Sequence, residues 1–188
     1  MVFFTSDLHL GHDSVIGFCN RPFASVEEMD AVLINNWNKK VKNNDTVYIV
    51  GDFVWQKCAP DKYLRQLNGK KILVTGNHDH WAKKAEYISY FEEITQYKEM
   101  SLNNHPITLC HYPMIEWKNS RKEGSSRLGY LIYGHAHNNV RPEYRLLFEK
   151  PNALNAGVDI NGFSPVDFDE LTENNKKFSA FALEQLTK

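Results

Sequence analysis

Seven side chains of metal-binding type are spread along the chain, each shortly after an apolar run. They combine carboxylate, amide and imidazole groups: Asp7, His9, Asp52, Asn77, His111, His135 and His137. Oxygen and imidazole ligands together suit borderline divalent ions such as manganese, iron, zinc or nickel, whereas oxygen ligands alone favour magnesium or calcium. Seven ligands are too many for one tetrahedral ion and suit two ions that share a ligand. We therefore expect two divalent metal ions as cofactors, manganese first, with iron, zinc or nickel as alternatives.

Asp52 is the natural shared ligand, because one carboxylate can offer an oxygen to each of two ions. Two divalent ions carry four positive charges, against which Asp7 and Asp52 supply only two negative ones. The remaining positive charge suits a phosphate group.

Five apolar runs must position these ligands. Each is short and rich in β-branched and aromatic residues, which is typical of a buried strand. They cover residues 2–4, 46–50, 72–74, 107–110 and 131–133. In an open α/β sheet, the residues just past the carboxyl ends of the strands share one crevice. We therefore expect the ligands to meet at one place.

Helices are expected between the first strands. Ser25 followed by Glu28 resembles a capping box that opens a helix ending near Lys40. Shorter helices are expected over 60–67 and 79–89. The order of strands and helices predicts a layered α/β architecture.

The pattern changes after Glu93 to short extended pieces, which indicates a second group of antiparallel or mixed strands. A helix over 168–175 and a final strand over 178–186 are expected to follow. A length of 188 residues with 42% hydrophobic content fits one domain, 1–188, with a sizeable core.

Charge and hydropathy favour a cytoplasmic protein without a membrane partner. Lys and Arg total 22 against 23 Asp and Glu, so no basic field indicates nucleic acid, although such a substrate stays open. The amino terminus lacks the pattern of a secretory signal, and no apolar stretch approaches a membrane span. The oligomeric state is not predicted.

The ligand blocks resemble, in order and spacing, the signature of calcineurin-like metallophosphoesterases. The blocks are Asp7-Leu8-His9, Gly51-Asp52, Gly76-Asn77-His78-Asp79, His111 and Gly134-His135-Ala136-His137. The resemblance implies a β-sandwich of two mixed sheets flanked by helices. Gly51-Asp52 is not followed by the Asp-Arg-Gly of the protein serine/threonine phosphatases, so the small bacterial or phage-type members are the nearer kin.

The resemblance also implies roles for individual residues. It places Asp7, His9, Asp52 and His137 on a first metal ion, and Asp52, Asn77, His111 and His135 on a second. It makes His78 the residue that protonates the leaving oxygen, and Asp79 the residue that orients His78. We hypothesise hydrolysis of a phosphodiester or small phosphate ester by in-line attack of a metal-bridging hydroxide.

Two other functions stay open. A metal-dependent nuclease would share this chemistry but needs a groove lined with basic and aromatic groups, whereas the lysine pairs of this chain are scattered. A catalytically silent binding module of the same fold would have degraded ligand blocks, and these blocks are intact. The expected partner is a small phosphorylated substrate.

Arg21 and Arg127 are the candidate substrate-binding residues. Both lie in loop-like sequence near the ligand blocks, where a guanidinium could fork onto phosphate oxygens. The alternative is that they are solvated surface groups. Trp117 could stack on a base or pack in the core, and no chemistry is attached to the segment 155–162.

Overall fold

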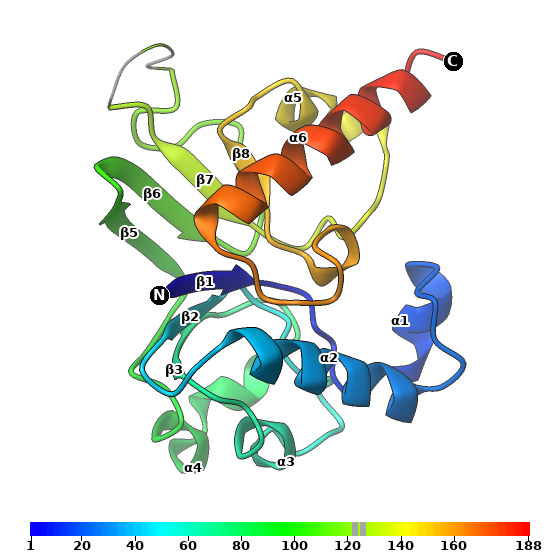
Figure 1. The fold of residues 1–188 in the computed structure, drawn as a ribbon, viewed down its shortest axis with the longest axis vertical. Helices are drawn as coiled ribbons and strands as arrows, with labels where there is room; N and C mark the ends of the chain where they lie inside the picture. The colour runs from blue at the N-terminus through cyan, green and yellow to red at the C-terminus, as the bar shows by residue number, and fades with distance from the viewer. Residues whose placement is uncertain (122–123, 125–126) are drawn as a thin grey trace.

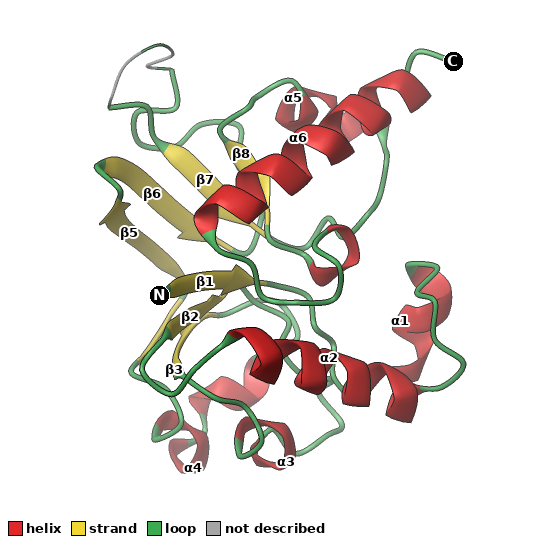
Figure 2. Cartoon of the chain, viewed as in Figure 1, coloured by secondary structure: helices red, strands yellow, loops and turns green. Residues whose placement is uncertain are grey.

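The computed structural model describes residues 1–121, 124 and 127–188, and its centre is two four-stranded sheets (Figures 1 and 2). The first sheet has the order β1-β2-β3-β4, and all its neighbours pair in parallel. Its strands are β1 (Val2–Thr5), β2 (Thr46–Ile49), β3 (Lys70–Val74) and β4 (Glu93–Thr95). Parallel neighbours need crossover connections, and the helices between these strands supply them.

The second sheet has the order β5-β6-β7-β8 and is mixed. Strands β5 and β6 are antiparallel, and the other two pairs are parallel. The strands are β5 (Tyr97–Leu102), β6 (His105–Cys110), β7 (Tyr130–Tyr133) and β8 (Ala153–Asn155). The predicted α/β sandwich with flanking helices is confirmed. In detail, the four strands of the first sheet pair in parallel, with one antiparallel bridge from Phe4 to Val166, whereas the second sheet is mixed along its strands.

Side chains alternate across the first sheet and build two cores. Phe4, Ile72 and Val74 point into a cluster that they share with Ile107, Leu109 and Ile132 of the second sheet. The intervening positions pack against the helices, with Phe3, Val47, Ile49 and Leu73 beside Leu33 and Trp37. Burial of both faces explains why these strands read as continuous apolar runs.

Helices cover the outer faces of the two sheets (Figure 2). The α-helices are α1 (Asp13–Phe18), α2 (Val26–Lys40), α3 (Asp61–Leu64), α4 (Ala85–Ile88), α5 (Arg145–Phe148) and α6 (Phe168–Gln185), and the short 3-10 helices are η1 (His80–Lys83), η2 (Pro142–Tyr144) and η3 (Val158–Ile160). Ser25 caps α2 by accepting a bond from the Glu28 amide, as the sequence predicts. In the described part of the chain, no helix has the length and apolarity that crossing a membrane requires.

Three predicted elements differ from the structure. The helix expected over 79–89 is broken into η1 and α4, and the helix expected over 60–67 is only α3. The strand expected over 178–186 was wrong, because α6 continues through it to Gln185. A capping box of Asp167 and Glu170 starts α6, and its buried Leu171, Asn175 and Ala182 recur at helical spacing.

Candidate metal centre

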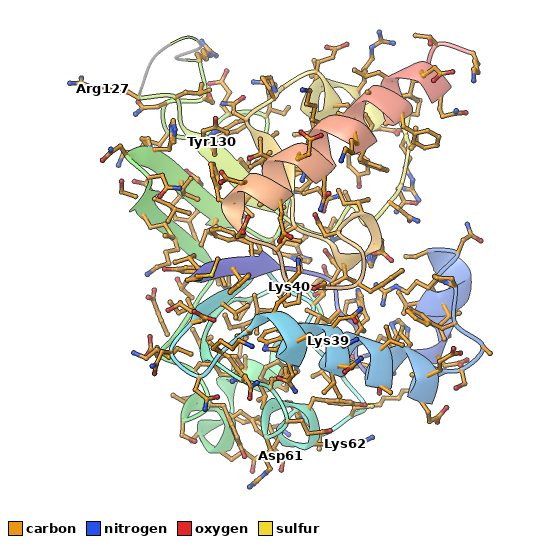
Figure 3. The ribbon with its side chains drawn as sticks, in the orientation of Figure 1. Lys39, Lys40, Asp61, Lys62, Arg127 and Tyr130 are labelled. Atoms are coloured by element: carbon orange, nitrogen blue, oxygen red, sulfur yellow. The ribbon has the colours of Figure 1, made fainter. Side chains whose placement is uncertain are left out.

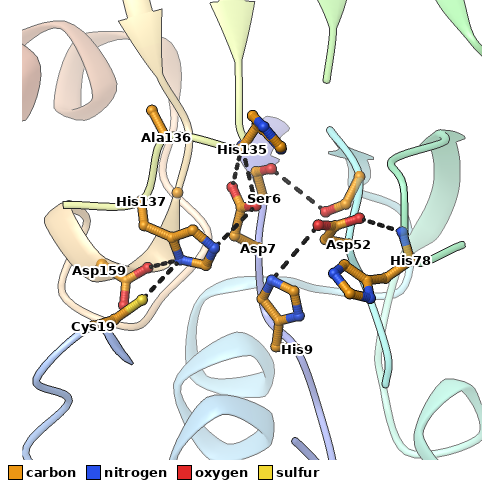
Figure 4. A network of polar contacts seen from close by, with 12 residues as sticks. Ser6, Asp7, His9, Cys19, Asp52, His78, His135, Ala136, His137 and Asp159 are labelled. Atoms are coloured by element: carbon orange, nitrogen blue, oxygen red, sulfur yellow. Dashed lines mark hydrogen bonds and ion pairs between the residues drawn. The ribbon is translucent and has the colours of Figure 1, made fainter. Parts of the chain in front are cut away.

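The predicted ligands follow the carboxyl ends of strands from both sheets and meet between them. Figure 4 shows Asp7, His9, Asp52, His135 and His137 at this place. The loops after β1 and β2 stay in register beyond the strands. The amide of Asp7 donates to the Gly51 carbonyl at 3.0 Å, and the amide of His9 donates to the Asp52 carbonyl at 3.0 Å. On the other sheet, the Gly134 amide donates to the His111 carbonyl at 2.9 Å. Ladder-like bonds therefore join the ligand loops after β1 and β2 to each other, and those after β6 and β7 to each other.

Most of the ligands sit on backbone in the left-handed region. The φ angles are 55° for Asp7, 51° for His9, 54° for Asp52, 67° for His135 and 50° for His137. Such non-glycine residues each cost about 1–3 kcal/mol and persist where the surroundings impose them, commonly at functional sites. Gly51 has a φ of 90°, and a Cβ there would lie 2.2 Å from His111 Nδ1. The tight turns therefore bring the ligand side chains together.

A first cluster consists of Asp7, His9 and His137, whose ligand atoms all lie within 4.8 Å of one another. Asp7 is fully buried and His9 is 3% exposed. Both oxygens of Asp7 lie 3.0 Å from the donating amide of His135. Burial raises the pKa of Asp7 and lowers the pKa of His9 well below its ordinary value. A neutral imidazole is the form that binds metals.

A second cluster consists of Asp52, His111 and His135, also within 4.8 Å of one another. Asn77 joins it, because its Oδ1 lies 3.2 Å from His111 Nε2 and 3.1 Å from His135 Nδ1. His111 Nδ1 bonds to the Val50 carbonyl at 2.9 Å, which leaves Nε2 to face the cluster. All seven predicted ligands are therefore brought together.

Asp52 lies between the two clusters. Its Oδ2 is 3.6 Å from His9 Nε2 and 3.4 Å from His111 Nε2. Burial raises the pKa of Asp52, but the bond and charge of His111 outweigh it and hold the pKa well below its ordinary value. Burial lowers the pKa of His111, and the bond to Asp52 reverses this and raises the pKa to about 9.

The chemistry of His9 tests whether these residues fit a metal. Among the described residues, its two buried ring nitrogens have no hydrogen-bond partner. Buried polar atoms are almost always paired, and an ion bound at this ring would explain the exception. The donor set of carboxylates, an amide and imidazoles also suits divalent transition metals. The residues fit a metal centre.

His78 lies beside this centre. A nitrogen of its ring is within 4.8 Å of ligand atoms of His9 and Asp52, and its amide donates to Asp52 Oδ1 at 2.8 Å (Figure 4). The ring of His12 stacks on Trp55 with centroids 3.8 Å apart, and the Trp55 centroid is 5.3 Å from that of His78. His78 is therefore flanked by the candidate ligands His9 and Asp52 and by the aromatic pair of His12 and Trp55.

The role expected for Asp79 needs correction. Backbone amides occupy both of its oxygens: Oδ2 accepts from Asp52 at 2.7 Å and Gly76 at 2.8 Å, and Oδ1 accepts from Phe53 at 3.0 Å. Burial raises the pKa of Asp79 to about 6. Asp79 thus joins the loops after β2 and β3, and it acts on backbone amides where we expected it to orient the His78 ring.

Arg21 is also not where a substrate-binding residue would be. Its side chain is 0% exposed and forms an ion pair with Asp159 at 2.8 Å. Its guanidinium also donates to the backbone oxygens of Asp7 and Leu8. Asp159 in turn lies 2.8 Å from His137 Nδ1. Reasoning from sequence missed Asp159, although it lies in the segment 155–162 to which we attached no chemistry.

Arg127 is exposed, and it precedes Tyr130 at the start of β7 (Figure 3). His135 follows the carboxyl end of that strand, whereas Arg127 precedes its amino-terminal end, away from the ligands. The structure therefore does not bring Arg127 together with the ligands, and its contact with substrate stays a prediction. Trp117 is 8% exposed and donates to the Gly129 carbonyl at 2.8 Å, so it packs in the core.

A pocket of about 540 Å³ adjoins the second cluster. Asn77 and His111 belong to the second cluster and also line this pocket. The rest of its lining includes Lys83, Thr95, Gln96 and Tyr112. Tyr112 is 48% exposed, and its ring centroid is 4.9 Å from that of His135. A larger hollow of about 730 Å³ is lined by Lys39 and Lys40 of α2 and by residues of α6, and none of the candidate ligands lines it. Figure 3 labels the two lysines.

Comparison with known proteins gives the family. The model of the calcineurin-like phosphoesterase superfamily domain matches residues 1–158, and the chain belongs to this superfamily of phosphoesterases. The uncharacterized protein MJ1445 of Methanocaldococcus jannaschii is 33% identical over 171 residues, which cover 89% of this chain and 87% of that protein. The gene 66 protein of Mycobacterium phage L5 is 28% identical over 163 residues, 71% of this chain and 76% of its own.

A solved structure shares the fold. The protein of unknown function AQ665 from Aquifex aeolicus superposes with a TM-score of 0.69 at 31% identity, covering 92% of this chain and 98% of its own. The expected relation to calcineurin-like metallophosphoesterases is confirmed.

Proposed function

We propose that this protein is a dinuclear metal-dependent phosphoesterase that hydrolyses small phosphodiesters. The observation that carries the proposal is the place of Asp52, whose Oδ2 lies within 3.6 Å of an imidazole nitrogen from each cluster. One carboxylate between two ligand sets is the arrangement expected for a shared metal ligand.

The chain supplies a separate ligand set for each ion. Asp7, His9 and His137 would hold the first ion, Asn77, His111 and His135 the second, and Asp52 both. When bound, two divalent ions neutralise charge on the phosphoryl oxygens and acidify an attacking water. We expect manganese first, with iron, zinc or nickel as alternatives, because a mixed oxygen and imidazole set suits these borderline divalent ions.

His78 is the proposed general acid. Its ring is part-buried beside Asp52 and His9, on the side of the site that His12 and Trp55 border. A proton donated from this ring to the departing oxygen would replace charge that the leaving group must otherwise carry. The leaving group would then lie toward the aromatic pair of His12 and Trp55.

A phosphodiester needs a second binding site, which holds the ester group that stays on the phosphate. The 540 Å³ pocket beside Asn77 and His111 is of the size of small-molecule sites and has Tyr112 on its lining. A monoester has no group to fill it. The proposal therefore favours diesters over monoesters.

Hydrolysis assays test this function. Protein stripped with a chelator and reloaded with Mn²⁺ would be given bis(p-nitrophenyl) phosphate, p-nitrophenyl phosphate and a single-stranded oligonucleotide. We expect turnover of the diester above the monoester, and loss of turnover in the stripped protein. Preferential cleavage of the oligonucleotide would instead indicate a nuclease, and no turnover of any substrate would indicate a binding module.

A further inference from the structure

A buried carboxylate lies behind His137. The Asp159 side chain is 1% exposed, and its Oδ2 is 2.8 Å from His137 Nδ1, with Cys19 Sγ 3.3 Å from the same nitrogen (Figure 4). Because a carboxylate can only accept, the bond places a proton on Nδ1. The other nitrogen, Nε2, lies 3.7 Å from Asp7 Oδ1 and is the one that faces the first cluster.

Arg21 holds this carboxylate in place. Its Nε lies 2.8 Å from Asp159 Oδ1 and its Nη2 lies 3.2 Å from Oδ2, so both oxygens are engaged by one guanidinium fork. The same guanidinium donates to the Asp7 carbonyl at 2.7 Å and to the Leu8 carbonyl at 2.9 Å. One buried ion pair therefore connects the loop after β1 with the ring that follows β7.

Stability alone does not account for this pair. The cost of removing two charges from water offsets most of their attraction, so a buried ion pair is a weak source of stability. Its geometry does what an apolar pair cannot, because it fixes the orientation and tautomer of the His137 ring. Carboxylates that hold a metal-binding histidine typically change metal affinity 10–100-fold.

We propose that Asp159, fixed by Arg21, is a positioning residue that orients His137 for the first metal ion without contacting that ion. The inference rests on the proposed dinuclear centre and concerns only its first half. In the second half, the Val50 carbonyl does the corresponding work for His111. Loss of Asp159 should therefore weaken one ion and spare the other.

Metal binding by the whole chain tests this inference without an activity assay. Chelator-stripped protein would be dialysed against graded Mn²⁺, and bound metal would be counted by mass spectrometry. The variants are Asp159→Asn, Asp159→Ala and the pair Arg21→Met/Asp159→Asn, which leaves no uncompensated buried charge if a single variant folds poorly. Asp45→Asn is the matched control. Asp45 is a buried carboxylate that accepts from the Lys42 amide. It lies directly before β2, at the amino-terminal ends of the strands, whereas the ligands follow their carboxyl ends.

The wild-type protein and the control should bind two ions per chain. Each Asp159 variant should keep one ion at wild-type affinity and bind the other about 10–100-fold more weakly. Asn keeps an acceptor for Nδ1 and should lose less affinity than Ala. Unchanged binding of both ions by all three variants, or equal weakening of both, would overturn the inference alone. A wild-type protein that binds no Mn²⁺ would contradict both this inference and the proposed function.

Discussion

The carboxylate of Asp79 accepts a hydrogen bond of 2.7 Å from the backbone amide of Asp52. The same side chain accepts from the amides of Phe53 and Gly76, so a single buried residue fixes the loops after β2 and β3. Each of these loops carries ligands of the second cluster.

Asp79→Ala should therefore destabilise the protein, because three backbone amides lose their acceptor. We expect a loss of about 2–5 kcal/mol in the free energy of unfolding, since burying donors without partners costs about 1–3 kcal/mol each and part is recovered by water. Urea unfolding of metal-free protein measures it. Asp13→Ala, at an exposed position of α1, serves as the control. A loss below about 0.5 kcal/mol, within the range of ordinary surface substitutions, would show that the amides do not depend on Asp79.

Replacing His78 tests the proposed proton donor. His78→Ala should bind both ions and lower kcat about 10²–10⁴-fold for a diester with an alkyl leaving group, the usual size of general acid catalysis. The loss should be much smaller with p-nitrophenol, which leaves without a proton. His105→Ala, a ring packed against Tyr130 away from the site, should match the wild type. Equal losses for both leaving groups would count against a proton-transfer role.

Tyr112 should determine preference for large diesters. In Tyr112→Ala, KM for bis(p-nitrophenyl) phosphate should rise about 10-fold, since an aromatic contact contributes about 0.5–1.5 kcal/mol beyond the area it buries. KM for a small monoester should not change. Ile115→Ala is the control, because Ile115 is 68% exposed and does not line the pocket. If KM rises for both substrates together, the pocket does not hold the second ester group.

Asp30 makes the stability of the fold depend on pH through its contact with Gly11, the residue before His12. It accepts from the Gly11 amide at 2.9 Å and from the Tyr63 hydroxyl at 2.8 Å, and burial raises its pKa. The folded state therefore binds more protons than the unfolded state above about pH 3.8, and this group makes stability fall as pH rises through its raised pKa.

Asp30→Asn should remove this dependence. Chemical unfolding at pH 4 and at pH 7 gives the free energy of unfolding of both proteins. The value for the variant minus that for the wild type should be larger at pH 7 than at pH 4. If this difference in the free energy of unfolding is smaller at pH 7 than at pH 4, the hydrogen bonds from Gly11 and Tyr63 outweigh the effect of burial on the Asp30 carboxylate.

The sequence predicts well which candidate ligands meet between the sheets, because each of them follows a strand, and parallel strands bring their carboxyl ends to one side of a sheet. Asp159 could not be found this way. It follows β8 in a segment with no recurrent pattern, and its role depends on contacts with Arg21 and His137, which lie far away along the chain. Arg21 was misplaced for the same reason, since a single sequence does not indicate which arginine is buried.

The last helix illustrates a second limit. The segment over 178–186, where we expected a strand, contains Phe178 and Phe181, and aromatic residues are common in strands. In the structure their rings lie within 6.5 Å of each other on α6, and Phe181 is 52% exposed. The periodicity set by Leu171, Asn175 and Ala182, with its capping box, decides the helix.

The number of metal ions per chain tests the central claim most directly. After stripping and reloading, mass spectrometry should count two Mn²⁺ ions in the wild-type protein, while Asp52→Asn should retain at most one and lose its phosphoesterase activity. A wild-type count of none or one, or an Asp52→Asn variant with full activity, would contradict the account.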